Sequence, residues 1–473
     1  MASIKLTIDG KEIAAETGET IIQAAEKVGI NIPHYCYHPG LSIDGNCRMC
    51  LVEVEKAPKP MIACSTRVAE GMVVKTQTEK VVKMRRSVME FLLINHPLDC
   101  PTCDQAGECR LQDYYMQYDE IPSRFKEEKI HKNKMINLGA NVMLDQERCV
   151  ACTRCIRTCQ EVAGVDELAL ANRGDHVTIT TFPGKELSNP YAGNVVDVCP
   201  VGALTNKKFR FKKRVWFLKS TPSVCTGCSR GCNVWIDHAD SVVYRLRPRF
   251  NPDVNKYWMC DEGRYGFEFI NQKRILRPLL VTEGESQEIS YEQALTEVID
   301  LLKGVNTAQI AVVAHAGQTA ENLKSFHEFA VKVLKTDKLY YSKNEVDHPT
   351  QDSILITPDK NANQAEINRL GFKPVTELAE AKGILVLNNL SRKDLAHLMG
   401  KKIPLLALWA SNESDVVSKT RVVLPVPTFA EQGGNFTNVD GRVQEITKAF
   451  EPKGESRLLR DSLVVLQHML ASN

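Results

Sequence analysis

The chain has 473 residues, of which 43% are hydrophobic and 25% are charged, and its formal net charge is +2. A balance this close to zero excludes a general electrostatic attraction to nucleic acid or to an anionic membrane surface. The length is enough for roughly three domains at about 150 residues each. No apolar run approaches the roughly 18 residues of a membrane span, and the N-terminus lacks a signal region. We therefore expect neither a transmembrane segment nor a signal peptide.

The first part of the chain predicts a small mixed α/β fold. Residues 3–15 predict a β-hairpin, because two alternating stretches flank Asp9-Gly10, a pair favoured in type I′ turns. Apolar residues at helical spacing predict a short helix over 21–28. Short strands are expected at 51–55, 61–65 and 72–76. Residues 1 to about 78 should therefore form one domain with a long cysteine-containing loop.

The rest of the chain changes character twice. An amphipathic helix is expected over residues 80–95, and it breaks before Pro97, so His96 lies where this helix ends. A compact cysteine-rich segment follows at about 219–274. After residue 275, helical stretches alternate with buried strands, which is typical of a doubly wound α/β domain. The expected helices are 291–304 and 319–334, and the expected strands are 310–315, 384–389 and 404–410.

All 16 cysteines lie between Cys36 and Cys260, and residues 261–473 contain none. A disulfide framework would suit a small secreted domain, whereas this chain is large and shows no signal peptide. Reduced thiols acting as metal ligands are the better interpretation. The distribution also predicts a front half that carries cofactors and a back half with another role.

The first group of cysteines has the pattern Cys36-x10-Cys47-x2-Cys50-x13-Cys64. A close pair with two outlying thiols on a small β-rich domain favours a 2Fe–2S cluster, although the first gap is wider than in plant-type ferredoxins. A structural zinc site is the alternative. His34 and His38 flank Cys36, and we expect them to pack or hydrogen-bond rather than to ligate.

A second group along the chain is His96-x3-Cys100-x2-Cys103-x5-Cys109. Three thiols and one imidazole are also a familiar zinc arrangement. Between other iron–sulfur sites, a 4Fe–4S cluster is the more fitting occupant. Imidazole is neutral where a thiolate is anionic, so this cluster should have a raised potential, as in Rieske centres.

The third group, Cys149-x2-Cys152-x2-Cys155-x3-Cys159, reproduces the run of a bacterial ferredoxin, and Cys199-Pro200 supplies a remote ligand. The mirror-image run that a second cluster would need is missing, since Asn189, Ala192 and Val195 stand at its positions. One 4Fe–4S cluster is therefore expected here, held by Cys149, Cys152, Cys155 and Cys199. Cys159 is then left without a cluster.

The fourth group is Cys225-x2-Cys228-x3-Cys232-x27-Cys260. Three clustered thiols and a remote one favour a third 4Fe–4S cluster closed by a long loop, with zinc as the alternative.

Four redox centres in one chain predict an electron conduit rather than a catalyst, so no catalytic residue is assigned. No Rossmann, Walker, nucleophile-elbow or zincin motif is present. The basic run from Lys207 to Arg214 is interpreted as a solvated linker or an interface with an acidic partner, and not as a nucleic-acid site. A structural protein with about four zinc ions remains the non-redox alternative, and it would contain no acid-labile sulfide.

The order of these four groups, with the His96 site second, resembles the large iron–sulfur subunit of bacterial NADH:quinone oxidoreductase (respiratory complex I). The stretches GNVVDVCPVGALT (193–205) and CTGCSRGC (225–232) are similar to segments of that family. The resemblance implies an α+β multidomain protein with a β-grasp 2Fe–2S ferredoxin domain, ferredoxin-like cluster domains and a molybdopterin-oxidoreductase-like α/β domain. The implied boundaries are 1–78, 79–118, 119–218, 219–274 and 275–473.

The resemblance also implies an electron route. Electrons would arrive from a flavin-bearing, NADH-binding subunit and its 2Fe–2S partner at the Cys36 cluster. They would continue to the Cys149 cluster and the His96 cluster, and leave for a ferredoxin-like 4Fe–4S subunit on the way to quinone. The Cys225 cluster would lie off this route. The implied location is peripheral, on the cytoplasmic side of the bacterial inner membrane, among other peripheral-arm subunits. The alternative is the iron–sulfur subunit of a soluble NAD-linked hydrogenase or formate dehydrogenase.

The back half is similar to molybdopterin oxidoreductases at FAEQGGNFTNVDGRVQ (429–444). Only about 200 residues follow Cys260, none of them cysteine, and an acidic residue of Asp261-Glu262 stands where those enzymes typically carry a relay lysine. We therefore expect a truncated domain that binds no molybdopterin and serves as a scaffold.

Overall fold

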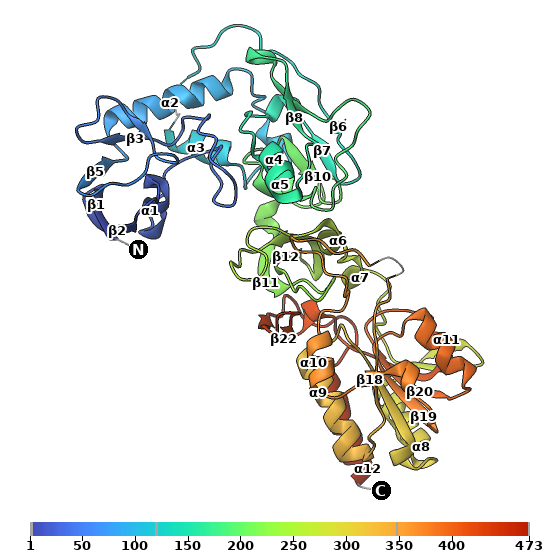
Figure 1. The fold of residues 1–473 in the computed structure, drawn as a ribbon. Coiled ribbons are helices and arrows are strands. Elements are labelled where there is room, and N and C mark those ends of the chain that lie inside the picture. Colours follow the sequence, from blue (N-terminus) through green and yellow to red (C-terminus); the bar gives the residue numbers. More distant parts are fainter. Residues whose placement is uncertain (1–2, 119–121, 347–348, 472–473) are drawn as a thin grey trace. The chain divides into compact units, whose positions relative to one another are not determined.

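A computed structural model describes residues 3–118, 122–346 and 349–471. The chain divides into two compact units, Met1–Phe217 and Leu218–Asn473, which are described separately (Figure 1). In the described part of the chain, no helix has both the length and the hydropathy that crossing a bilayer requires.

The first unit begins with a five-stranded sheet of β-grasp type. Its order is β2-β1-β5-β3-β4, with β1 antiparallel to β2 and parallel to β5. Asp9 and Gly10 both have positive φ, at 49° and 81°, as the expected type I′ turn requires. The elements are β1 (Ser3–Ile8), β2 (Lys11–Glu16), α1 (Ile21–Lys27), β3 (Leu51–Val54), β4 (Met61–Ile62) and β5 (Met72–Lys75). The expected fold of this segment is confirmed.

Helix α2 (Glu79–Leu93) leads from this sheet to the second group of candidate ligands. The Thr78 hydroxyl caps it by accepting from the Val81 N–H at 3.2 Å. Buried side chains of α2 include Arg85 and Met89. Helix α3 (Arg110–Tyr118) follows the ligand loop and packs against α2.

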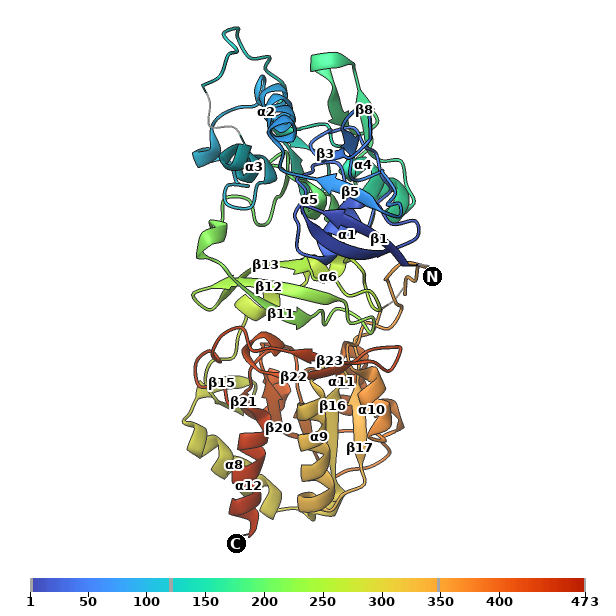
Figure 2. The same cartoon turned by 90° about the vertical axis from the view of Figure 1, so that its left-hand side faces the viewer.

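The remainder of the first unit supports the third group of cysteines. It contains a small antiparallel sheet, a two-stranded ribbon and two short helices. They are β6 (Ile136–Asn137), β7 (Val142–Leu144), β8 (Ala169–Ala171), β9 (Thr178–Thr180), β10 (Leu204–Asn206), α4 (Arg154–Arg157) and α5 (Asn194–Val198). The two helices are labelled α4 and α5 in Figure 2, and the ribbon is labelled at β8. Helix α4 runs directly into a π-helical turn, η3 (Thr158–Ala163), which Gly164 ends in the left-handed conformation.

The second unit starts with an antiparallel sheet and two short helices around the fourth group. These are β11 (Lys219–Val224), β12 (Asn233–Ala239), β13 (Val242–Pro248), α6 (Asp261–Tyr265) and α7 (Glu268–Asn271). A further ribbon, β22 (Gly434–Thr437) with β23 (Val443–Ile446), comes from the glycine-rich segment late in the chain. Strand β23 contacts β11.

The large sheet of this unit has eight strands in the order β15-β14-β21-β20-β19-β16-β17-β18. The six strands from β21 to β18 are parallel, and the order of the strands reverses at β16, as it does in dinucleotide-binding folds. The strands are β14 (Leu279–Thr282), β15 (Glu285–Glu288), β16 (Ile310–His315), β17 (Leu339–Ser342), β18 (Lys373–Pro374), β19 (Gly383–Leu387), β20 (Leu405–Ala410) and β21 (Thr420–Pro425).

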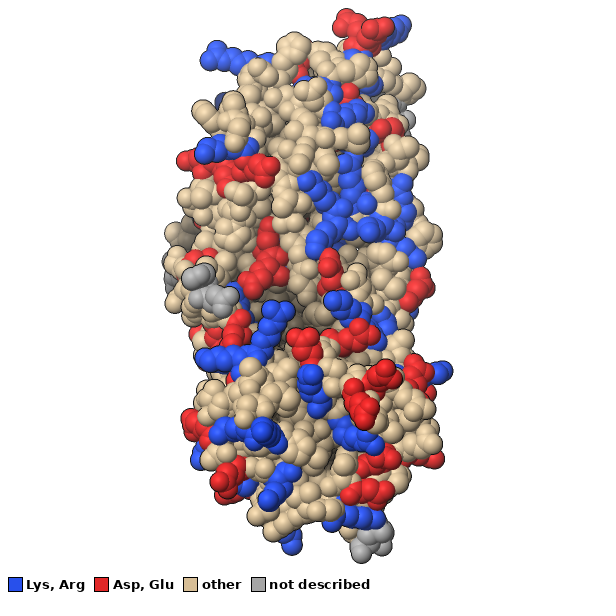
Figure 3. Space-filling view, turned by 90° about the vertical axis from the view of Figure 1, so that its right-hand side faces the viewer, with Lys and Arg blue, Asp and Glu red and all other residues tan. Residues whose placement is uncertain are grey.

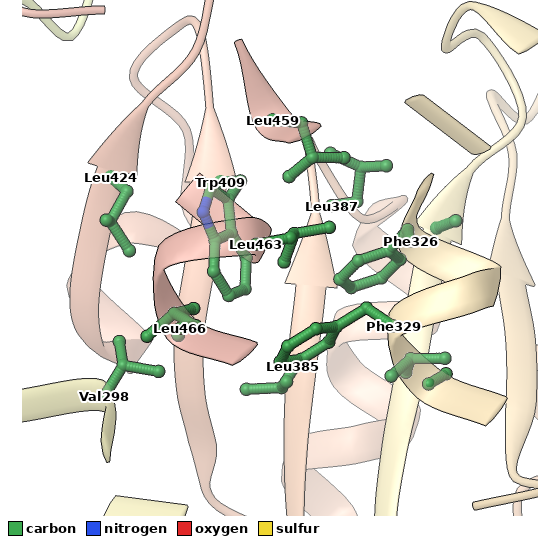
Figure 4. Close-up of a cluster of buried hydrophobic side chains, with 14 of the residues drawn as sticks. Val298, Phe326, Phe329, Leu385, Leu387, Trp409, Leu424, Leu459, Leu463 and Leu466 are labelled. Carbon is green, nitrogen blue, oxygen red and sulfur yellow. The ribbon is translucent and has the colours of Figure 1, made fainter. Parts of the chain in front are cut away.

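Both faces of this sheet are covered, so β16, β19 and β20 are buried along their whole length and apolar except for His315 at the end of β16. Helices α8 (Tyr291–Lys303), α9 (Ala320–Glu328) and α12 (Leu459–Ala471) pack on one face around the fully buried Trp409 (Figure 4). Helix α11 (Arg392–Gly400) contributes Leu398 to the core on the other face. The expected doubly wound α/β domain is confirmed. The helix expected over 319–334 is α-helical only to Glu328 and continues as a π-helical turn, Phe329–Leu334.

Candidate iron–sulfur cluster sites

The first group of cysteines gathers at one end of the β-grasp sheet. Cys36 and Cys47 lie on the loop between α1 and β3, Cys50 directly precedes β3, and Cys64 follows β4. The hydrogen bond with Cys47 is the largest cause that lowers the pKa of Cys36. The hydrogen bond with Cys36 is the largest cause that raises the pKa of Cys64. The Tyr35 N–H points at the Cys47 sulfur, 3.5 Å away. The contacts among the thiols place the Cys36 thiol beside those of Cys47 and Cys64, and the Cys50 thiol beside that of Cys64.

The two histidines beside Cys36 are engaged locally. The His34 ring Nδ1 lies 2.8 Å from the Ile32 carbonyl, and the His38 Nδ1 accepts from the Gly40 N–H at 3.1 Å. Burial lowers the pKa of His34 to about 4 and that of His38 to about 3, so both rings are neutral at pH 7. These contacts agree with packing and hydrogen bonding as their role.

The third group lines a single cavity. Cys149, Cys152, Cys155 and Cys199 all face it, together with apolar side chains such as Leu144 and Ile179. The Ala151 N–H points at the Cys149 sulfur, 3.4 Å away. Burial raises the pKa of Cys149, Cys152 and Cys199 to about 11. Crowded buried thiols of this kind become thiolates only when cationic metal compensates their charge, so the donor set fits an iron–sulfur cluster.

Cys159 is not among the residues that line this cavity. It lies on the π-helical turn η3, is 1% exposed, and has a pKa that burial raises to about 12. That Cys159 does not serve this cluster stays a prediction.

The second group surrounds the end of α2 and the start of α3. Cys100 is exposed, whereas Cys109 is buried. Burial, with the positive charge of Arg148 as the next cause, lowers the pKa of His96 to about 4. The imidazole is therefore neutral at pH 7, which is the form that binds metal. Gly202 packs against this loop, and a Cβ at that position would collide with the Cys103 sulfur.

The fourth group also lines a single cavity, in the second unit, formed by Cys225, Cys228, Cys232 and Cys260 with Gly263 and Leu355. A Cβ on Gly263 would lie 2.7 Å from the Cys225 sulfur, so only glycine fits there. Burial raises the pKa of Cys260 to about 11. Among the described residues, no three His, Cys, Asp or Glu side chains converge as ligands of one metal ion do. The thiols of the third and fourth groups instead surround a space.

A lysine that the sequence did not reveal lies beside this fourth cavity. Lys360 is 8% exposed, and its Nζ donates to Glu262 Oε2 at 2.5 Å. The acidic segment at 261–262 is thus paired with a cation from a distant loop. No local pattern around residue 360 could have indicated this contact, because 98 residues separate the partners.

Hydrogen bonds connect the third group to both others in the first unit. The Asn46 amide, beside Cys47, donates to the Ala151 carbonyl at 3.1 Å. The Arg110 N–H, next to Cys109, donates to the Pro200 carbonyl at 2.9 Å. The Arg148 guanidinium, next to Cys149, pairs with Asp99 at 2.7 Å. The third group therefore contacts the first and the second.

The basic run contacts the exposed side of the second group. Arg214 donates to the carbonyls of Pro101 and Cys103, and the Phe211 N–H donates to Asp104 Oδ1 at 2.8 Å. Phe211, Trp216 and Phe217 remain largely exposed. Figure 3 shows one face of the molecule, on which lysine and arginine side chains gather in the upper part of the view.

Family models match most of the chain. A 2Fe-2S iron-sulfur cluster binding domain matches residues 1–79, and the NADH-ubiquinone oxidoreductase-G iron-sulfur binding region matches residues 85–120. The ferredoxin-like domain of NADH-quinone oxidoreductase subunit 3 matches residues 139–205. The molybdopterin oxidoreductase Fe4S4 domain matches residues 218–272, and the molybdopterin oxidoreductase family matches residues 359–461. The domains for binding 2Fe–2S and 4Fe–4S clusters are therefore present.

The curated relatives that match the chain are named as subunits of NADH-quinone or NADH-ubiquinone oxidoreductases. The G subunit of the NADH-quinone oxidoreductase of Rickettsia conorii is 42% identical over 347 residues, which is 73% of this chain and 51% of the relative. The mitochondrial NADH-ubiquinone oxidoreductase 78 kDa subunit of Neurospora crassa is 45% identical over 68% of this chain and 43% of its own length. A solved NAD+-reducing [NiFe]-hydrogenase chain is 27% identical, with a TM-score of 0.41, over 45% of this chain and 92% of its own. The chain spans about half the length of the curated relatives it matches.

Proposed function

We propose that this chain, which belongs to the G-subunit family of NADH-quinone oxidoreductases over the residues it shares with its relatives, conducts electrons within an NADH:quinone oxidoreductase. The observation that carries the proposal is the gathering of cysteines into separate groups, two of which each line one cavity with four thiols. When bound, iron–sulfur clusters supply one-electron transfer without a change in the protein's covalent structure.

We assign one 2Fe–2S cluster to Cys36, Cys47, Cys50 and Cys64. Three 4Fe–4S clusters are assigned to His96 with Cys100, Cys103 and Cys109, to Cys149, Cys152, Cys155 and Cys199, and to Cys225, Cys228, Cys232 and Cys260. The thiols would bind as thiolates, and the His96 ring as the neutral imidazole. Matches to 2Fe–2S and 4Fe–4S domain families over the same segments support this assignment.

The contacts between ligand loops support one order of transfer. Asn46 and Ala151 join the first site to the third, and Arg110 with Pro200 joins the third to the second. The third site therefore adjoins both of the others, and with entry at the first site, as the family resemblance implies, electrons would continue to the third and leave from the second. Cys100 of the second site is exposed, so a partner subunit could approach this site.

The partners follow from this direction. A flavin-bearing, NADH-oxidising subunit with its own 2Fe–2S partner would deliver electrons, and a ferredoxin-like 4Fe–4S subunit would accept them. Other peripheral-arm subunits would cover the remaining surface. The chain would lie peripherally on the cytoplasmic side of the bacterial inner membrane. The α/β part of the second unit would serve these neighbours as a scaffold and bind no molybdopterin.

The test is low-temperature EPR on the dithionite-reduced full chain, purified without oxygen, with iron and sulfide counted on the same sample. The proposal requires signals of one 2Fe–2S and three 4Fe–4S centres, with about 14 iron and 14 sulfide per chain. A colourless protein with about four zinc ions and no acid-labile sulfide would overturn it.

A further inference from the structure

Two arginines of α4, Arg154 and Arg157, lie between the first and the third sites. Each is only 8% exposed, although a guanidinium is charged at any physiological pH. They flank Cys155 within the ligand run of the third site. Their side chains reach across to the loop that carries Cys36.

Arg154 bonds to residues beside a ligand of each site. Its NH1 group donates to the Val198 carbonyl, directly before Cys199, at 3.0 Å. Its NH2 group donates to the Tyr37 carbonyl, directly after Cys36. This one guanidinium therefore contacts both ligand loops.

Arg157 contacts the ligands themselves. Its NH2 group donates to the Cys36 carbonyl at 2.7 Å and to the Cys152 carbonyl at 3.1 Å. Its NH1 group donates to the Ser42 carbonyl, and its Nε donates to the Thr153 hydroxyl at 3.2 Å.

All of these acceptors are neutral. Over the described ranges, no Asp or Glu carboxylate forms an ion pair with either guanidinium. Two acids of the same network, Asp44 and Glu161, accept instead from the hydroxyls of Thr153 and Ser42. Buried cations without a counter-ion are strongly unfavourable.

The thiolates of the two sites are the available compensation. Arg154 directly precedes Cys155 and reaches the carbonyls beside Cys199 and Cys36, and Arg157 reaches the carbonyls of Cys36 and Cys152. These four thiols belong to the first and the third groups only. The compensating charge therefore comes from both sites at once.

We propose that Arg154 and Arg157 are shared counter-ions of the first and third clusters, and that their charges raise the reduction potentials of both. This inference rests on the proposed function, since it needs clusters at both sites. A positive charge near a cluster stabilises its reduced, more negative form. One pair of side chains would thus shift the potentials of two successive centres in the same direction and leave the difference between them nearly unchanged. The two arginines act as positioning and tuning residues and not as ligands.

The test is an EPR-monitored redox titration of the full chain carrying Arg154→Gln or Arg157→Gln. We expect each variant to lower the midpoint potentials of the first and third clusters by about 59 mV. For one electron, this shift is a roughly tenfold decrease in the equilibrium constant of reduction. A unit charge ~10 Å away at an effective dielectric constant of ~20 has an effect of this size. The cluster of the fourth site should not shift.

Matched variants separate charge from shape. Arg154→Lys and Arg157→Lys keep the charge and should stay near the wild-type potentials, whereas Arg173→Gln removes an exposed charge and should change nothing. Unchanged potentials in both glutamine variants would overturn the inference, and so would equal shifts in the lysine variants. If Arg154→Gln does not fold, the comparison of Arg157→Gln with Arg157→Lys decides the test. A wild-type protein without cluster signals would instead contradict the proposed function.

Discussion

The backbone N–H of Arg110 donates to the carbonyl of Pro200 at 2.9 Å, and this bond joins the residue after Cys109 to the residue after Cys199. This hydrogen bond thereby holds together two ligand loops that are 90 residues apart in sequence. Pro200 is buried, so its carbonyl has no water to replace the bond. The second and third sites therefore depend on each other for their geometry.

Arg110→Pro should weaken this connection selectively. Arg110 is the first residue of α3, where proline is well accommodated, so the substitution removes the donor without breaking the helix. We expect the free energy of unfolding to fall by about 1–3 kcal/mol, because the buried Pro200 carbonyl loses its hydrogen-bond donor. In a chelator challenge followed by EPR, the signals of the second and third clusters should disappear faster than in the wild type.

Arg110→Ala is the matched control, since it removes the same side chain and keeps the N–H group. Its cluster signals should decay at nearly the wild-type rate. Equal behaviour of the alanine and proline variants would show that the bond contributes nothing measurable. The fourth cluster, which belongs to the other unit, should be unaffected in both.

His96→Cys should lower the midpoint potential of the second cluster. The variant replaces a neutral imidazole with an anionic thiolate, and the more negative cluster is harder to reduce. Redox titration monitored by EPR measures the shift, and the first cluster of the same sample serves as the internal reference. A potential that does not move would count against ligation by His96.

A buried histidine in the second unit should make stability depend on pH. His315 ends β16, its Nδ1 accepts from the Gly317 N–H at 3.0 Å, and burial lowers its pKa from 6.5 to about 4. Between these two values the unfolded chain binds a proton that the folded chain does not. The stability contributed by the neutral ring is therefore complete above pH 6.5 and declines as the pH falls toward 4.

His315→Asn should flatten this dependence. The wild type should lose about 2 kcal/mol more than the variant between pH 7 and pH 5, since each pKa unit is worth 1.36 kcal/mol. Urea unfolding followed by tryptophan fluorescence at both pH values gives the comparison. Parallel profiles for wild type and His315→Asn would contradict the prediction.

The grouping of the cysteines could be predicted from spacing because ligand runs are local. Three ligands of the third group lie within seven residues, and the Cys-Pro signature identified the remote one; the structure brings all four to one cavity. The buried strands at 310–315, 384–389 and 404–410 could also be predicted from the sequence. The strands of a parallel sheet that is covered on both faces form nearly continuous apolar runs.

Other features depend on partners far away in sequence. Arg154 and Arg157 looked like ordinary charged residues of a ferredoxin run, and their role depends on carbonyls more than 100 residues earlier. Lys360 beside Glu262 is of the same kind. The change from α to π geometry at Phe329 leaves the apolar pattern of the helix intact, so periodicity alone could not reveal it.

Cys159 offers a direct test of how the ligands are divided. It lies in the ferredoxin run, yet it does not line the cavity that Cys149, Cys152, Cys155 and Cys199 share. Cys159→Ala should therefore keep the full content of iron and sulfide, and the third cluster should keep its EPR signal. Cys155→Ala is the matched variant and should lose about four iron together with that signal. If the Cys159 variant lost the same amount of iron, the division of the thiols into four groups of ligands would have to be redrawn.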